Sequence, residues 1–73
     1  MQNEFENIGI GIRTMRHIHG MTLNELSRKS GLSPSYLSRI ENGKSLPSAT
    51  SIRRIAKPLG GNDFYLRLIP FLE

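Results

Sequence analysis

Residues 31–44 read GLSPSYLSRIENGK, and this stretch decides how the rest of the chain is interpreted. Leu37 and Ile40 supply an apolar stripe at helical spacing. The rest of the segment is polar and mostly uncharged, with Ser35, Tyr36, Ser38 and Arg39 between them. A helix that only faced water would carry more Glu and Lys, and one that only packed would carry more Leu and Ala. The composition therefore favours a helix whose polar face is read by a partner.

The boundaries of this helix are marked by residues with distinct backbone preferences. Ser33 is a good N-cap, and Pro34 follows at the first helical position, where a missing N–H costs nothing. Asn42 and Gly43 tolerate the left-handed backbone that ends a helix. The sequence thus predicts a helix over residues 34–41.

A second helix is predicted just before this one. Residues 22–25, TLNE, fit a capping box, in which the Thr22 hydroxyl accepts from the N3 amide and the Glu25 carboxylate accepts from the cap amide. The helix should begin at Leu23 and stop at Gly31. Upstream, an amphipathic first helix ends near residues 19–20, with Phe5, Ile8, Ile12 and Met15 on its apolar side. Gly9 and Gly11 weaken that helix.

Downstream, Ser48 can cap a fourth helix with Ile52, Ile55, Ala56 and Leu59 on one side. Pro58 and the glycine pair at 60–61 close it, and Asn62 or Asp63 can cap a fifth helix. No window has the alternation and β-branched enrichment of a strand. We therefore expect one all-α domain over residues 1–73, a compact set of five short helices that cross at steep angles.

Composition narrows the classes of function. The chain has 73 residues, no cysteine and a formal net charge of +4, with a sequence pI near 10.1. The length allows a single domain with a small core, and the charge favours an anionic partner such as nucleic acid or a membrane surface. The absence of cysteine gives no support to secretion, and FYLRLIPFL is far too short to span a bilayer. The prediction is a cytoplasmic protein.

Catalysis has no support in the sequence. His17 and His19 are two residues apart and point to different sides of a helix, and the chain has one Asp and no Cys. Neither a metal site nor a catalytic triad fits this set. GIGIR near the start lacks the preceding strand and third glycine of a dinucleotide motif. We expect no enzyme activity, no metal and no cofactor, and no small-molecule ligand is evident from the sequence.

Two short helices joined by a tight turn over residues 31–33 form a helix-turn-helix unit. In such a unit the first helix lies across the DNA backbone and the second enters the major groove with its N-terminus first. Small residues at the start of the second helix, here Pro34 and Ser35, let its backbone approach the bases.

With these elements in place, residues 8–59 resemble the Cro-type, or xenobiotic-response-element, family of helix-turn-helix repressors. The match rests on Ile8, Ile12, Arg13 and Arg16, then MTLNELSRKSGLSPSYLSRIENGKSLPS, then IRRIAKPLG. The resemblance implies a repressor-like five-helix fold. It also implies a sequence-specific regulator of transcription that binds double-stranded DNA, most simply a repressor. The alternative is a protein-interaction module of the same fold that binds another regulator through Leu23 and the apolar C-terminus.

The resemblance also implies roles for individual residues. The base-contacting set is Pro34, Ser35, Tyr36 and Arg39, and the phosphate-contacting set is Arg13, Leu23, Ser33, Ser38, Asn42 and Lys44. Alternatives stay open: Arg39 as a solvated or phosphate-bound arginine, Tyr36 as a ring that covers the turn, and Asn42 and Lys44 as ordinary surface residues. Arg16 and Glu41 correspond to the family's partly buried ion pair, or else are unrelated surface charges.

Two residues depart from the family pattern. Pro58 replaces a residue of higher helix propensity, so we expect the fourth helix to end early. Leu23 stands where the family usually has a Gln that touches the DNA backbone. A leucine side chain cannot donate a hydrogen bond, so a phosphate contact at this position depends on backbone amides and the helix dipole.

The C-terminal segment, residues 62–73, predicts a homodimer. Its apolar residues fall all round a helix, more than a core this small can bury on one side. The predicted interface is Phe64, Tyr65, Leu68, Ile69, Phe71 and Leu72, and a two-fold dimer would match a pseudo-palindromic operator. The competing interpretation has Pro70 bend the tail back onto its own core, or has the tail bind a membrane or another protein.

Overall fold

Five α-helices and two short 3₁₀ helices make up most of residues 4–72, the part of the chain that the computed structural model describes. In chain order they are α1 (Glu4–Ile18), α2 (Leu23–Ser30), α3 (Pro34–Glu41), α4 (Ala49–Ala56), η1 (Lys57–Leu59), α5 (Asn62–Leu68) and η2 (Ile69–Phe71). The predicted apolar contact of Phe5 lies outside the described side chains. No helix in residues 4–72 combines the length and apolar character needed to cross a membrane.

The helix-turn-helix boundaries fall where local sequence predicts them. At the start of α2 the Glu25 amide donates to Thr22 Oγ1 at 3.1 Å, and the Thr22 amide donates to Glu25 Oε1 at 3.0 Å. At the start of α3 the Tyr36 amide donates to Ser33 Oγ at 3.1 Å. Gly31 ends α2 with φ +75°, a left-handed conformation that glycine adopts without steric cost.

Pro58 shortens the fourth helix as expected, whereas the predicted cap of the last helix is wrong. α4 ends at Ala56, and Leu59 lies on η1, because Pro58 lacks the amide that would continue an α-helical ladder. Leu59 is nevertheless fully buried. Neither Asn62 nor Asp63 caps α5: Gly61 precedes the helix and makes no side-chain cap bond. The Asp63 carboxylate instead accepts from Arg67 Nε at 2.9 Å, one turn along the helix.

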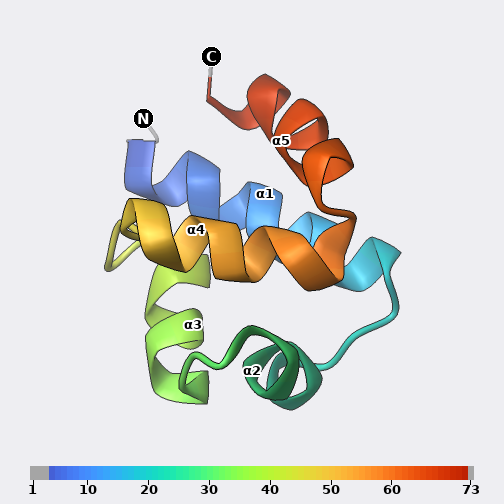
Figure 1. The fold of residues 1–73 in the computed structure, drawn as a ribbon. Coiled ribbons are helices and arrows are strands. Elements are labelled where there is room, and N and C mark those ends of the chain that lie inside the picture. Colours follow the sequence, from blue (N-terminus) through green and yellow to red (C-terminus); the bar gives the residue numbers. More distant parts are fainter. Residues whose placement is uncertain (1–3, 73) are drawn as a thin grey trace.

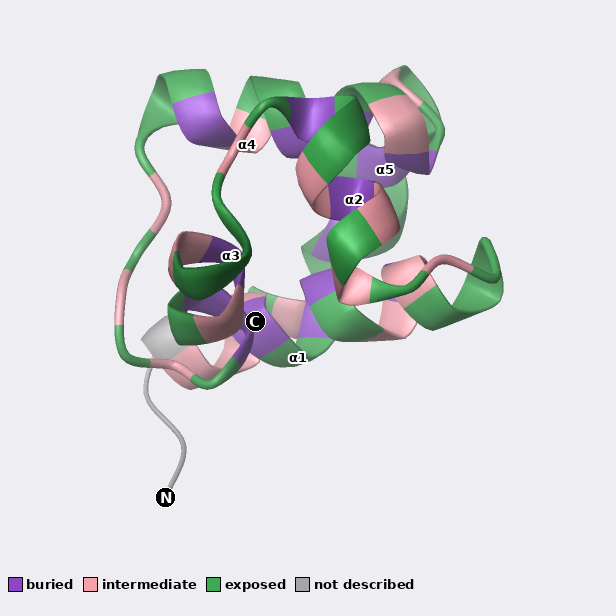
Figure 2. Cartoon of the chain, turned by 90° about the horizontal axis from the view of Figure 1, so that it is seen from below, coloured by how far each residue is buried: buried purple, intermediate pink, exposed green. Residues whose placement is uncertain are grey.

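A single core holds the helices together. Its ten buried apolar residues include Ile12, Leu26, Leu37, Ile55 and Phe64, so every α-helix contributes. In Figure 1, α1 and α4 run across the view, α2 and α3 lie below them, and α5 rises on the other side. α2 is seen almost end-on, so it crosses α4 steeply, as predicted. Figure 2 shows the buried faces of the helices turned toward one another.

Two glycines in α1 allow neighbouring helices to come close. A Cβ on Gly9 would lie 2.7 Å from the Glu41 carbonyl oxygen at the end of α3. A Cβ on Gly11 would lie 2.8 Å from Leu68 Cδ1 and 2.9 Å from Phe71 Cγ. The residues that weaken α1 as an isolated helix therefore permit its tertiary contacts with α3 and with the C-terminal segment.

Candidate nucleic-acid interface

The turn between α2 and α3 is held by two serine hydroxyls. Ser27 Oγ donates to the Leu32 carbonyl at 2.6 Å, and the Leu32 amide donates to Ser30 Oγ at 3.2 Å. Below the turn, Leu26 and Leu37 are fully buried. Because both the turn and the packing beneath it are fixed, the start of α3 is presented in one orientation.

α3 has one buried side and one exposed polar side. Leu37, Ile40 and Glu41 face the interior. The exposed residues are Ser33, Pro34, Ser35 and Arg39. The Arg39 side chain makes no hydrogen bond or ion pair with the rest of residues 4–72. Its guanidinium is therefore available for an external acceptor.

Tyr36 does not share this exposure. Its ring is half-buried against the core, and its hydroxyl donates to Ser51 Oγ on α4 at 3.1 Å. Ser51 is itself buried and donates its amide to Ser48 Oγ at 3.1 Å. Tyr36 thus joins α3 to α4, and only part of its ring faces outward.

Three of the predicted phosphate-contacting residues lie together at the C-terminal end of α3. Arg13 Nη2 donates to Asn42 Oδ1 at 2.7 Å, and Asn42 Nδ2 donates to Ser38 Oγ at 3.3 Å. Arg13 Nε also lies 3.4 Å from Glu41 Oε1. Sequence patterns do not predict the Arg13–Asn42 contact, because 29 positions separate the two residues. Lys44 is exposed beside this cluster.

Arg16 and Glu41 lie in contact between α1 and the end of α3. Arg16 Nε donates to Glu41 Oε2 at 2.8 Å, and Nη2 donates to Oε1 at 2.9 Å. Only 12% of the arginine side chain and 3% of the glutamate side chain are exposed. The hydrogen bond to Glu41 raises the pKa of Arg16, while burial acts in the opposite direction. Desolvation offsets much of the attraction in such a pair, so it fixes geometry more than it adds stability.

The side chains of Leu23 and Ser33 both interact with other parts of the protein. Leu23 is half-buried and packs on the core. Its amide occupies the first position of α2, where a helix supplies no acceptor. The Ser33 hydroxyl accepts the Tyr36 amide as the cap of α3. Leu23 is thus only partly available to the protein partner that the alternative interpretation requires, whereas the apolar C-terminal residues of that alternative include exposed ones.

The predicted dimer surface needs one correction. Phe64 is 0% exposed and Leu68 is 5% exposed, so both belong to the core of this chain and are closed to a partner. They are buried because one side of α5 packs on α1 close to Gly11. Phe71 is half-buried at the same place, whereas Tyr65, Ile69 and Leu72 are exposed, together with Leu66.

Within residues 4–72 no three His, Asp or Glu side chains group as metal ligands.

Comparison with known proteins gives consistent matches. The helix-turn-helix family model HTH_3 matches residues 12–66. The HTH-type transcriptional repressor RghR of Bacillus subtilis is 38% identical over 55 residues, which are 74% of this chain and 41% of RghR. The chain thus spans about two fifths of RghR. The HTH-type transcriptional regulator y4dJ of Sinorhizobium fredii is 32% identical over 53 residues, which cover 73% of this chain and 69% of y4dJ.

Solved structures agree over almost the whole chain. The clp gene regulator ClgR from C. glutamicum superposes with a TM-score of 0.83 and 28% identity, covering 99% of this chain and 95% of ClgR. The restriction-modification controller protein C.Esp1396I, as a tetramer in complex with its natural 35 base-pair operator, superposes with a TM-score of 0.84 and 27% identity. That match covers 99% of this chain and 97% of the controller protein. Together with the helix-turn-helix geometry, these matches show that the chain belongs to the Cro-type helix-turn-helix family of non-enzymatic, DNA-binding transcription regulators.

Proposed function

We propose that the chain is a sequence-specific repressor that inserts α3, residues 34–41, into the major groove of double-stranded DNA and occludes a promoter. The exposed polar face of α3 carries this proposal, because it offers small residues at the helix start and an unpaired guanidinium one turn later. Arg39 can bridge the O6 and N7 acceptors of guanine, while Pro34 and Ser35 let the backbone approach the bases. Tyr36 contributes only its outward ring edge. Such a regulator works in the cytoplasm, on the nucleoid.

Phosphate contacts orient this helix in the groove. Lys44 and the first amides of α2, including that of Leu23, are donors on either side of α3. The cluster of Arg13, Ser38 and Asn42 adds donors at the C-terminal end of the helix. These contacts position the protein on the duplex but do not distinguish one base pair from another.

The experiment that tests sequence-specific binding is selection from random-sequence duplex DNA, followed by sequencing of the bound fragments. We expect a defined motif. An affinity that is equal for selected and unselected duplexes would contradict specific readout.

The salt dependence of DNA binding tests the phosphate contacts. The logarithm of the affinity should fall linearly with the logarithm of the salt concentration, by about 0.9 for each phosphate neutralised. A DNA affinity that does not change with salt would contradict the electrostatic contacts proposed here.

We also propose that the chain binds its operator as a symmetric homodimer. Support comes from the exposed apolar residues of the C-terminal segment, where Leu66 is 66% exposed and Leu72 is 53% exposed. Apolar surface of this kind commonly marks an interface. The related controller protein occupies its operator as a tetramer. Two copies with recognition helices about 34 Å apart would read a pseudo-palindromic site.

A further inference from the structure

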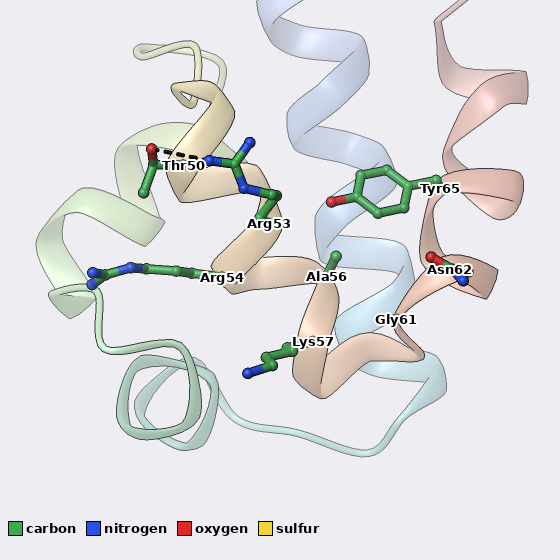
Figure 3. Close-up of a pocket in the computed structure, with 8 residues that line it drawn as sticks. All are labelled: Thr50, Arg53, Arg54, Ala56, Lys57, Gly61, Asn62 and Tyr65. Carbon is green, nitrogen blue, oxygen red and sulfur yellow. Dashed lines mark hydrogen bonds between the residues drawn. The ribbon is translucent and has the colours of Figure 1, made fainter.

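A shallow cavity of about 480 Å³ lies over α4, on residues outside the base-contacting and phosphate-contacting sets named above. Figure 3 shows the exposed face of α4 as its floor, with Tyr65 of α5 on one side and Arg54 and Lys57 on the other. Gly61 forms part of the wall and adds no side chain to fill it.

The cations around this cavity lack carboxylate partners. Arg53, Arg54 and Lys57 lie within little more than one turn of the chain, and none forms an ion pair in residues 4–72. Arg53 reaches only the Thr50 hydroxyl, at 3.5 Å. Like charges spaced three and four residues apart destabilise a helix. An anion bound among them would remove that repulsion.

Tyr65 supplies an exposed aromatic ring on the opposite side of the cavity. Its ring meets the buried ring of Phe64 edge-on, with centroids 5.5 Å apart, so it is braced from behind while 38% of the residue stays exposed. Its hydroxyl points toward α4. An aromatic ring can stack on such a surface, and the Asn62 amide at the rim can hydrogen-bond a ligand.

The geometry points to a binding site for a small anion that carries a planar ring, of the chemical type of a nucleoside monophosphate. The phosphate binds Arg54 and Lys57, and the ring lies against Tyr65. A bare phosphate would reach only the cationic side of the cavity. A helix is about 10 Å across with its side chains. A ligand long enough to span α4 reaches both the cations on one side of the cavity and Tyr65 on the other.

Titration of the full chain with adenosine 5′-monophosphate, followed by backbone amide shifts in NMR spectra, tests the site. Adenosine and inorganic phosphate serve as half-ligands. We expect shifts over residues 53–57 and 61–65, and affinity for either half-ligand at least about tenfold weaker than for the nucleotide. No shift at about 10 mM nucleotide would overturn the inference.

Two variants separate a built site from general charge attraction. R54Q/K57Q should weaken nucleotide binding at least about tenfold, because each lost charge-assisted hydrogen bond is costly. The matched control R28Q/K29Q removes two adjacent exposed cations from α2 and should bind normally. Equal weakening by both pairs would overturn the inference.

Y65L tests the contact between the ring of the ligand and Tyr65. It should weaken binding of the nucleotide but not of inorganic phosphate, and an unchanged nucleotide affinity would contradict the ring contact.

A competition experiment separates this site from the DNA contacts. Nucleotide shifts over residues 53–57 should persist when the chain is saturated with a selected duplex, and R39A should keep nucleotide binding while it loses base preference. If duplexes of any sequence displace the nucleotide, the cations of α4 belong to the DNA backbone contacts and the inference is wrong. Failure of nucleotide binding with a normal DNA motif leaves the proposed repressor function intact.

Discussion

Arg39 and Lys44 have similar charge and exposure but should affect DNA binding differently. Arg39 projects from the exposed polar side of α3, whereas Lys44 follows the helix. R39A should relax the preference at one base pair by about 1–3 kcal/mol, and K44A should weaken all sequences alike. Selection from random duplexes with each variant measures both effects. If the two variants keep the same motif at full strength, the recognition face is assigned wrongly.

Gly9 and Gly11 offer a second comparison at the scale of single residues. Replacing either with alanine should favour an isolated helix by about 1 kcal/mol. A Cβ at Gly9 meets backbone oxygens of Ile40 and Glu41, which cannot rotate away, whereas a Cβ at Gly11 meets the flexible end of Leu68 and the ring of Phe71. We therefore expect G9A to destabilise the fold by about 1–3 kcal/mol and G11A to cost less.

Urea unfolding of both glycine variants measures this difference through the transition midpoint at constant slope. Equal destabilisation by the two variants would show that α1 can shift relative to α3, contrary to the close approach seen at Gly9.

At the scale of elements, the capping box sets the stability of α2. T22A removes the acceptor of the Glu25 amide and should cost about 0.5–2 kcal/mol. Hydrogen bonds to Thr22, first from its backbone amide, lower the pKa of Glu25, and the charges of Arg28 and Lys29 add to the effect.

The lowered pKa makes the contribution of Glu25 depend on pH. Because the pKa is lower in the folded state, the stabilisation is complete above the unfolded-state pKa and is lost as pH falls through the folded-state pKa. The difference in unfolding free energy between the natural chain and E25Q should therefore shrink in acid. Thermal unfolding from neutral to acidic pH measures this difference, and a constant value would contradict the proposed cap.

For the whole molecule, the proposed dimer depends on the exposed apolar residues of the C-terminal segment. Truncation before α5 would remove the core residues Phe64 and Leu68, so a fair test changes only exposed positions. The natural chain should sediment at twice its 8.2 kDa mass at micromolar concentration, and L66S/I69S should sediment as a monomer. L46S removes another exposed apolar side chain, in the loop before α4, and should leave the dimer intact. A natural chain that stays monomeric and protects a single half-site would contradict the proposed dimer.

The sequence by itself determined most helix boundaries and the family. Caps and turns depend on hydrogen bonds between residues a few positions apart, such as Thr22 with Glu25 and Ser33 with Tyr36, so residue types at fixed spacing are enough to predict them. The resemblance over residues 8–59 then implied the pairing of Arg16 with Glu41, which the residue pattern alone could not locate.

Tertiary structure alone decided which apolar and polar side chains are free. The apolar residues of α5 look equivalent in the sequence, yet Phe64 and Leu68 are buried while Tyr65 and Leu66 are exposed, because only one side of the helix packs on α1. The Tyr36 hydroxyl is engaged by Ser51, fifteen positions away, and Arg13 by Asn42, twenty-nine positions away. The cavity over α4 likewise needs Tyr65 from another helix. Contacts between residues so far apart in the sequence depend on the angles at which the helices cross, and the spacing of residues within one helix does not predict those angles.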